Sequence, residues 1–95
     1  MVLEVSQISG IGPYEIKHER DRDIYIKDQL AFLVIHHNTI EVRCDANLSD
    51  NLKQKYESVM DSRYYGKGGI EIVLAGQLNQ QEIEDLIRLS YLMTQ

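Results

Sequence analysis

Hydrophobic and polar positions alternate through the first half of the chain. Residues 14–18 place tyrosine, isoleucine and histidine on one side and two charged residues on the other, which is the period of a half-buried strand. Three further runs rich in β-branched or aromatic residues follow, at 24–27, 31–36 and 39–44. Short polar pairs at 28–29 and 37–38 fit tight turns between these runs. The pattern therefore predicts an antiparallel meander.

The period changes at Asp45, where hydrophobic residues begin to recur at helical spacing. They form one side of an amphipathic helix: Leu48, Leu52, Tyr56 and Val59. Asp45 or Asn47 is the expected N-cap, because either side chain can accept a hydrogen bond from an otherwise unpaired backbone N–H. After this helix the sequence predicts a strand to about Tyr65, a glycine-rich turn, and a strong strand over residues 70–75 that Gly76 ends.

The final helix has the clearest start signal in the chain. Asn79 is the expected N-cap, and Glu82 lies three residues later, as in a capping box. Leu78 and Ile83 are spaced to pack together across this start as a hydrophobic staple. The apolar face of the helix consists of Ile83, Leu86, Ile87 and Ser90, widened near its end by Leu89, Leu92 and Met93. We expect this face to pack against the sheet.

The length and composition predict one folded domain, residues 1–95. With 43% hydrophobic residues, the chain has enough apolar material for a core. The sequence Gly-Ile-Gly-Pro at 10–13 separates a short N-terminal segment, residues 1–9, which is either a strand or a frayed tail. The expected fold class is α+β, with an antiparallel meander, a C-terminal hairpin and two main helices.

The charge balance bears on the class of partner. Ten basic residues against 15 acidic ones give a net charge of −5, whereas nucleic-acid-binding proteins usually carry a basic surplus. Contact with DNA would therefore need a local basic patch. No segment approaches the roughly 18 apolar residues of a membrane span, and the start lacks the features of a signal peptide. A single cysteine, Cys44, fits a reducing compartment, so we expect a cytoplasmic protein without membrane contact.

No catalytic or metal-binding pattern stands out. His36 and His37 are adjacent near a strand end, so their side chains should point to opposite faces. Cys44 lies in an alternating strand, where it fits a small hydrophobic residue, and no Cys-x-x-Cys pair is present. Ser90 lies inside a helix, and the Gly-x-Ser-x-Gly motif is missing. We therefore expect no enzymatic activity, no bound metal and no cofactor.

The stretch RYYGKGG at residues 63–69 is the strongest candidate for a functional site. It lacks the Lys-Ser/Thr of a nucleotide-hydrolysing phosphate loop and leads into a strand, so that function is rejected. As part of a nucleic-acid-binding wing, Arg63 and Lys67 would contact phosphates, and Tyr64 or Tyr65 would stack on a base. The alternative is a plain hairpin whose glycines supply positive φ angles.

Several segments of the second half occur in an order found in one known family. They are VRCD at 42–45, a helix with Leu52 and Tyr56, RYYGK at 63–67, IEIV at 70–73 and LIRLSY at 86–91. This order resembles the MmcQ/YjbR family, whose patterns run LKCDP, YHMNKxHWNTV and LIDHSY, over about 55 C-terminal residues. Residues 24–34 match the family's VGGKMFAL strand pair loosely, with Gln29 at the position of its lysine.

The resemblance implies a curved antiparallel sheet with helices on one side, a double-wing fold described as DNA-binding and without an established reaction. Lys67 matches the family's lysine, and Ser90 and Tyr91 match its terminal Ser-Tyr. Tyr91 can instead pack on the sheet with its hydroxyl bonded to the backbone. The family's N-terminal helix has no counterpart in residues 1–13. Three characteristic residues of the family, a histidine, an asparagine and a tryptophan, are replaced by Tyr64, Gly66 and Ile70.

The resulting functional hypothesis is a non-enzymatic DNA-binding protein. Its contacts are expected to be weak and salt-sensitive, with Arg63 and Lys67 on phosphates, an aromatic surface from Tyr64 or Tyr65, and the concave sheet face along the duplex. The alternative is a protein-interaction or self-associating module, such as a homodimer. It would use an exposed sheet edge or the apolar end of the last helix.

Overall fold

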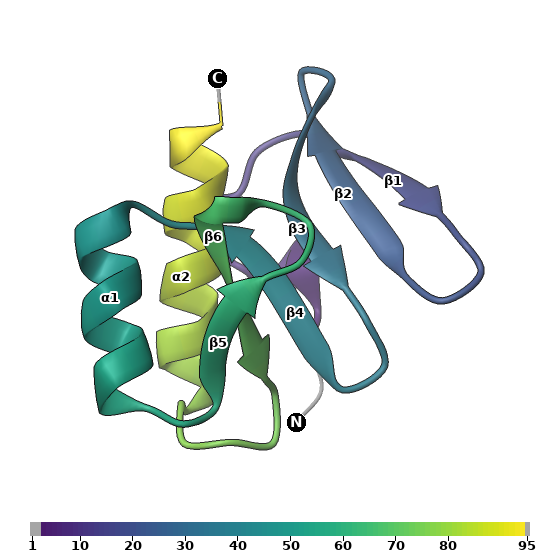
Figure 1. Ribbon diagram of the computed structural model, residues 1–95. Coiled ribbons are helices and arrows are strands. Elements are labelled where there is room, and N and C mark those ends of the chain that lie inside the picture. Colours follow the sequence, from purple (N-terminus) through teal and green to yellow (C-terminus); the bar gives the residue numbers. More distant parts are fainter. Residues whose placement is uncertain (1–2, 95) are drawn as a thin grey trace.

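The computed structural model describes residues 3–94, in which two α-helices cover one face of a six-stranded antiparallel sheet (Figure 1). The elements in chain order are η1 (Val5–Gln7, a 3₁₀ helix), β1 (Glu15–His18), β2 (Asp23–Lys27), β3 (Leu30–Ile35), β4 (Thr39–Arg43), α1 (Ala46–Lys55), β5 (Val59–Ser62), β6 (Gly66–Val73) and α2 (Gln80–Met93). The strands lie in the order β1-β2-β3-β4-β6-β5. The predicted meander is thus extended by the β5–β6 hairpin, and the α+β fold class is confirmed.

The two faces of the central strands differ in chemistry. On β4 and β6, Ile40, Val42 and Ile72 belong to the main core, which also contains residues of both helices. Glu41 and Glu71 alternate with them and therefore point to the opposite face. Both glutamates are buried, at 0% and 4% exposure. The face away from the helices, here called the second face, therefore carries buried charge.

A bulge lets two consecutive large side chains of β3 enter the main core. Leu33 pairs with Tyr25 and Ala31 pairs with Ile26, so Phe32 between them has no partner on β2. Phe32 and Leu33 are both fully buried in the main core. Beyond the bulge Ala31 returns to the second face, where it packs in a smaller apolar cluster with Ile24 and Val34.

Both helices begin at the predicted caps. Asp45, one of the two residues expected to start α1, accepts a hydrogen bond from Leu48 N at 2.9 Å. Asn79 and Glu82 form the complete capping box of α2, with hydrogen bonds of 2.8 and 3.0 Å. The prediction was wrong at the end of α1, because the helix stops at Lys55 and Val59 belongs to β5.

The N-terminal segment is neither the strand nor the frayed tail expected from its sequence. Its described part forms η1, and Val5 and Ile8 are buried in the main core; residues 1 and 2 lie outside the described part. The segment is attached to α2 by side chains of that helix. Arg88 Nε donates to Ser9 O at 2.6 Å, and Tyr91 Oη donates to the Pro13 carbonyl at 2.9 Å.

The β2–β3 turn offers a test of local strain. Asp28 and Gln29 have φ angles of 51° and 71°, as a two-residue type I′ turn requires. A glutamine in this region costs about 1–2 kcal/mol, which a glycine avoids at a smaller entropic cost. We expect Gln29→Gly to raise the free energy of unfolding by about 0.5–1 kcal/mol in urea denaturation. Gln54→Gly, at an exposed position in the last turn of α1, should lower the free energy of unfolding by up to about 1 kcal/mol. Equal effects of both changes would contradict the strain argument.

Candidate nucleic-acid interface

The turn of the β5–β6 hairpin is formed by Arg63, Tyr64 and Tyr65. The sequence had indicated a strand through Tyr65 and a turn at the glycines, but β5 ends at Ser62 and the glycines begin β6. Hydrogen bonds explain the difference, because Tyr65 N donates to Ser62 Oγ at 2.9 Å and Gly68 N donates to Tyr65 O at 3.1 Å. The Tyr65–Ser62 bond thus closes the turn at residues 62–65, and the Gly68–Tyr65 bond spans Gly66, which has a φ of 59°, and Lys67.

The carboxylate of Glu41, in the centre of β4, anchors this turn from the second face. Its Oε1 accepts hydrogen bonds from Tyr64 N and Ser62 Oγ, both at 2.8 Å, and its Oε2 pairs with His36 Nε2. Burial by itself would raise the pKa of Glu41. The hydrogen bonds from Tyr64 N, His36 and Ser62 outweigh burial and leave the pKa below its ordinary value. A buried, ionised carboxylate therefore fixes the position of the turn.

Arg63 is held by the neighbouring carboxylate on β6. Its Nε and Nη2 donate to the two oxygens of Glu71 at 2.9 and 2.8 Å, in a bidentate pair. Glu71 also accepts a hydrogen bond from Thr39 Oγ1 at 2.7 Å. The hydrogen bond and charge of Glu71 raise the pKa of Arg63, which keeps its charge. Much of that charge is neutralised by Glu71, although the side chain of Arg63 is exposed at the surface.

The two tyrosines of the turn have different environments. Tyr65 packs against the apolar cluster of the second face, and the Arg43 guanidinium lies 5.0 Å from its ring centroid. Burial strongly raises the pKa of Tyr65. Tyr64 is 40% exposed, and the Arg22 guanidinium lies 5.4 Å from its ring centroid. Tyr64, and not Tyr65, is therefore the tyrosine whose ring is exposed to a ligand.

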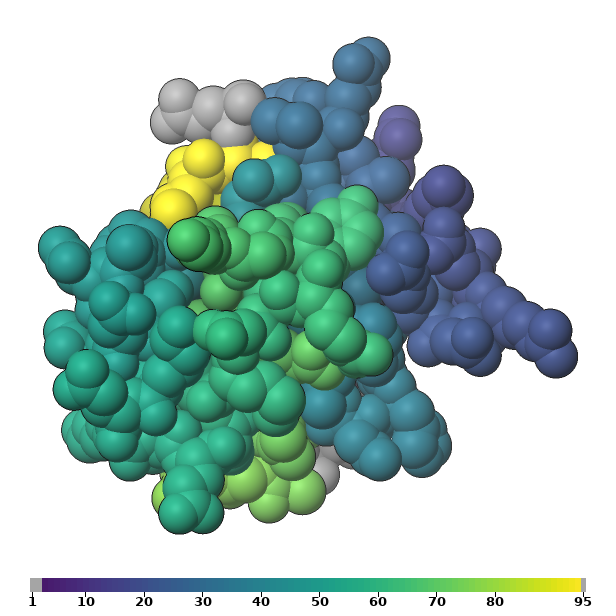
Figure 2. Space-filling model, viewed as in Figure 1, coloured from purple at the N-terminus to yellow at the C-terminus, as the bar shows by residue number. Residues whose placement is uncertain are grey.

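A second loop lies beside the turn on the same side of the molecule. This loop joins β1 to β2, and in Figure 2 it projects from the body next to the β5–β6 hairpin. A hollow of about 500 Å³ lies between the two loops. It is lined by Glu19, Arg20, Asp21, Arg22, His36 and Arg63. The turn at 63–65 and the loop at 19–22 are called the two wings below.

The charges of the two wings are partly paired. Arg22 Nε donates to Glu19 Oε1 at 2.7 Å, which lowers the pKa of Glu19. Arg20 takes part in no ion pair among the residues the structure describes. Among the described residues, the hollow therefore contains one guanidinium without an ion pair, that of Arg20. The other two are paired, Arg22 with Glu19 in the lining and Arg63 with Glu71 outside it.

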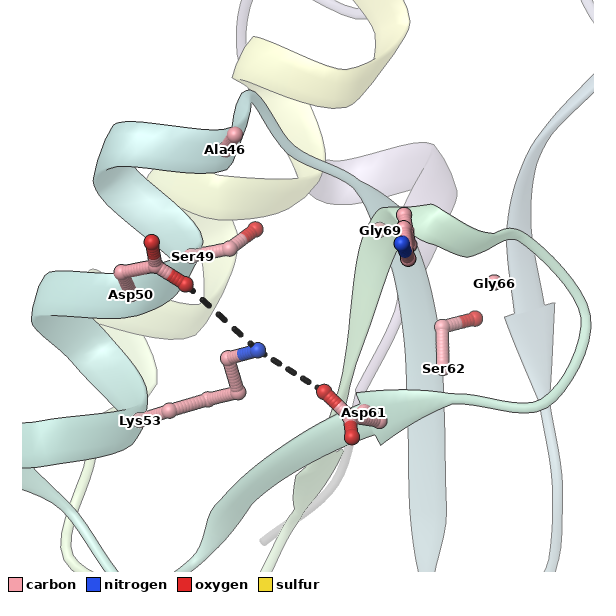
Figure 3. A pocket seen from close by; sticks show the side chains of 9 residues that line it. Ala46, Ser49, Asp50, Lys53, Asp61, Ser62, Gly66 and Gly69 are labelled. Atoms are coloured by element: carbon pink, nitrogen blue, oxygen red, sulfur yellow. Dashed lines mark hydrogen bonds and ion pairs between the residues drawn. The ribbon is translucent and has the colours of Figure 1, made fainter.

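Lys67 lies on the other side of the hairpin. It is exposed and lines a groove between α1 and β6, seen from close by in Figure 3. The four residues expected to contact nucleic acid are therefore divided. Arg63, Tyr64 and Tyr65 lie over the second face, and Lys67 faces α1.

Ser90 and Tyr91, which match the Ser-Tyr pair of the resembled family in sequence, both make contacts within the fold. Ser90 Oγ donates to Phe32 O at 2.6 Å and accepts from Arg43 N at 2.8 Å. The Tyr91 ring packs edge-on against Phe32, with centroids 4.9 Å apart, and its hydroxyl is bonded to the backbone. The packing hypothesis for Tyr91 is therefore confirmed.

The cysteine and histidines considered for catalysis or metal binding lie in the environments described next. Cys44 is buried, and burial raises the pKa of its thiol, which fits the expected small hydrophobic residue. His36 pairs with Glu41, whereas His37 is exposed in the β3–β4 turn. Residues 3–94 contain no group of three or more potential metal ligands, and none of their helices is long and apolar enough to cross a membrane.

Sequence reasoning missed four residues of the interface: Arg20, Arg22, His36 and Glu41. The charges at 19–23 alternate in sign, a pattern typical of a solvated loop, and nothing local shows that Arg22 reaches Tyr64. A signal did exist for Glu41, because it is a charge between two buried residues, Ile40 and Val42, and needs buried partners.

Comparisons with known proteins extend the description of the fold. No protein-family model matches the chain, and no curated protein matches it in sequence. A crystal structure of a protein from Pseudomonas syringae, a structural genomics target, superposes with a TM-score of 0.74. The match covers 86% of this chain and 87% of that chain, at 16% sequence identity. The two proteins therefore share a fold.

Proposed function

We propose that this protein is a non-enzymatic nucleic-acid-binding protein of the MmcQ/YjbR type, which contacts its ligand through the two wings. The observation that carries the proposal is the arrangement of Arg20, Arg22 and Arg63 around one hollow, with the exposed Tyr64 beside them. Guanidinium groups bind phosphates in a bidentate manner, and an exposed tyrosine can stack on an unpaired base.

The same geometry limits the strength of binding. Arg63 and Arg22 would have to share their guanidinium groups between phosphates and Glu71 or Glu19. The net charge of −5 adds a general repulsion of polyanions. With about 0.9 counterions released per phosphate contact, three arginines predict a slope of log K against log salt of roughly −2.7 on duplex DNA. Binding is therefore expected at low salt and to be lost near physiological salt.

Fluorescence anisotropy with labelled duplex and single strands tests this function. We expect Arg20→Ala combined with Arg22→Ala to weaken binding at least about tenfold and to reduce the salt slope by about 2. The matched control is Lys53→Ala with Lys55→Ala, which removes the same charge from α1 and should leave the salt slope nearly unchanged. No binding of either strand form at low salt, or equal losses in the two variants, would reject the proposal.

Self-association is the second candidate function, because the end of α2 exposes Leu89, Leu92 and Met93 at 37%, 57% and 41%. The sequence had predicted that this region packs on the sheet, but these three side chains remain outside the core. Three adjacent apolar side chains fit a small contact with a second copy. Light scattering tests self-association by measuring the molar mass in solution. A monomer at high protein concentration would reject this function.

A further inference from the structure

The groove that Lys67 lines is separate from the wings. It lies between α1 and the β5–β6 hairpin, and its volume is about 550 Å³, within the range of small-molecule sites (Figure 3). It is lined by Ala46, Ser49, Asp50, Lys53, Asp61, Ser62, Gly66, Lys67 and Gly69. None of the arginines of the wings lines this groove.

One wall of the groove is the sequence Gly-Lys-Gly-Gly at 66–69. Gly66 pairs with Ser62 and Ile70 pairs with Asp61, so the three residues between Gly66 and Ile70 have no partner on β5. Cys44 N donates to Gly68 O at 3.0 Å, which places the start of α1 directly beside this bulge. A glycine-rich backbone with a lysine therefore faces the N-terminus of a helix.

The floor of the groove contains an unsatisfied hydroxyl group. Ser49 is only 3% exposed, and its Oγ has no hydrogen-bond partner in the part of the chain that the structure describes. Figure 3 shows its side chain pointing from α1 toward the strands, into the groove. Its polar neighbour is the Cys44 thiol, whose sulfur is a weak acceptor. Buried hydroxyls normally have a partner, so an oxygen of a bound molecule would complete the site.

The two ends of the groove differ in charge. Lys67 and the first backbone amide of α1, at Ala46, favour an anion at one end, next to the Asp45 carboxylate that caps the helix by accepting from Leu48 N. At the other end Lys53 Nζ lies 2.8 Å from Asp61 Oδ1 and 3.7 Å from Asp50 Oδ1. Two carboxylates around one ammonium leave this end negative, so it would accept hydroxyl groups of a ligand and repel a second anionic group.

We propose that this groove binds a small polyhydroxylated monophosphate, such as a sugar phosphate. Lys67, the Ser49 hydroxyl and the backbone amide of Ala46 bind the phosphoryl group, and Asp50 and Asp61 accept hydrogen bonds from the hydroxyl groups of the ligand. The Ala46 amide is available because the first amides of a helix have no intrahelical acceptor. The site is one of binding alone, and it is independent of nucleic-acid binding by the wings.

An NMR titration of the full chain with ribose 5-phosphate tests the proposal. We expect saturable amide shifts at Ala46, Ser49 and residues 66–69, with a dissociation constant of about 1 mM or lower, and no such shifts with ribose. Ser49→Ala and Lys67→Ala should each weaken binding about tenfold, whereas Lys55→Ala, on α1 outside the groove, should not.

Several outcomes would overturn the site. They are equal binding of ribose and its phosphate, no saturable shifts up to about 10 mM, or unchanged affinity in both Ser49→Ala and Lys67→Ala. Ser49→Ala should cost little stability, since the only polar neighbour of its hydroxyl is the Cys44 thiol, a weak hydrogen-bonding group. Arg20→Ala with Arg22→Ala separates the two proposals, because it should weaken DNA binding and leave the sugar-phosphate affinity intact. Loss of both activities in that variant would contradict an independent groove.

Discussion

Glu41→Ala is expected to lower the free energy of unfolding by about 3–5 kcal/mol, the largest loss we anticipate for a polar residue of this protein. The change removes the acceptor of Tyr64 N, Ser62 Oγ and His36 together, and it leaves these buried donors without partners. Urea denaturation followed by circular dichroism measures the loss. Because the turn at 63–65 is held by this carboxylate, its amides should also lose protection from hydrogen exchange first.

Two further variants provide reference values for the stability loss of Glu41→Ala. Glu41→Gln keeps the shape of the side chain and one acceptor oxygen, so it should cost less, about 1–2 kcal/mol. Glu15→Ala removes an exposed glutamate from β1 and should change stability by less than about 0.5 kcal/mol. A loss below about 1 kcal/mol in Glu41→Ala would mean that the carboxylate does not anchor the turn.

The pH dependence of stability follows from the same carboxylate. The pKa of Glu41 is lower in the folded protein than its ordinary value of 4.5, so the unfolded chain binds the proton more readily. Its stabilising contribution is complete above about pH 4.5 and is lost as the pH falls through the folded pKa. The wild-type protein should therefore lose stability more steeply below pH 4.5 than Glu41→Gln does.

Gly69→Ala is expected to destabilise the protein by about 3 kcal/mol, at the upper end of the usual cost of overpacking. A Cβ atom at this position would overlap the backbone carbonyl oxygen of Val42 and lie 2.8 Å from Tyr65 Cβ. Neither atom can move freely, because Gly69 pairs with Arg43 on β4 and Tyr65 is packed on the second face. Thermal denaturation would show the loss as a lower melting temperature.

The adjacent glycine is the matched control. A Cβ atom at Gly68 would meet only Tyr65 O, at 3.4 Å, which is an ordinary contact. Gly68→Ala should therefore change stability by less than about 1 kcal/mol. If the two substitutions cost the same, the effect would come from the flexibility of the glycine-rich stretch instead of the close approach of β4 and β6.

The features that could be predicted from the sequence are those set by neighbouring residues. The capping box of α2 depends only on Asn79 and Glu82, and both were identified correctly. The β2–β3 turn at Asp28 and Gln29 is similarly local. The alternation of apolar residues was sufficient for the meander because each strand pairs with the next one along the chain.

The features that were missed depend on residues far apart in the sequence. The position of the hairpin turn is set by Glu41, 23 residues before Tyr64. Of the glycines that suggested a turn, Gly66 has a positive φ at the end of the turn, whereas Gly69 lies at a close approach to β4. The direction of Phe32 follows from a bulge that its own sequence does not reveal. The candidate site was incomplete for the same reason, since Arg22 and Tyr64 belong to different hairpins and meet only in the folded protein.

The attachment of the N-terminal segment to α2 has a consequence for how the protein is made. Arg88 and Tyr91 hold the backbone at Ser9 and Pro13 across separations of 79 and 78 residues. During synthesis on a ribosome, residues 9–13 must therefore wait until α2 has left the exit tunnel before they can dock. The meander can form earlier from local contacts, so this closing step should come last and should be sensitive to truncation of the final helix.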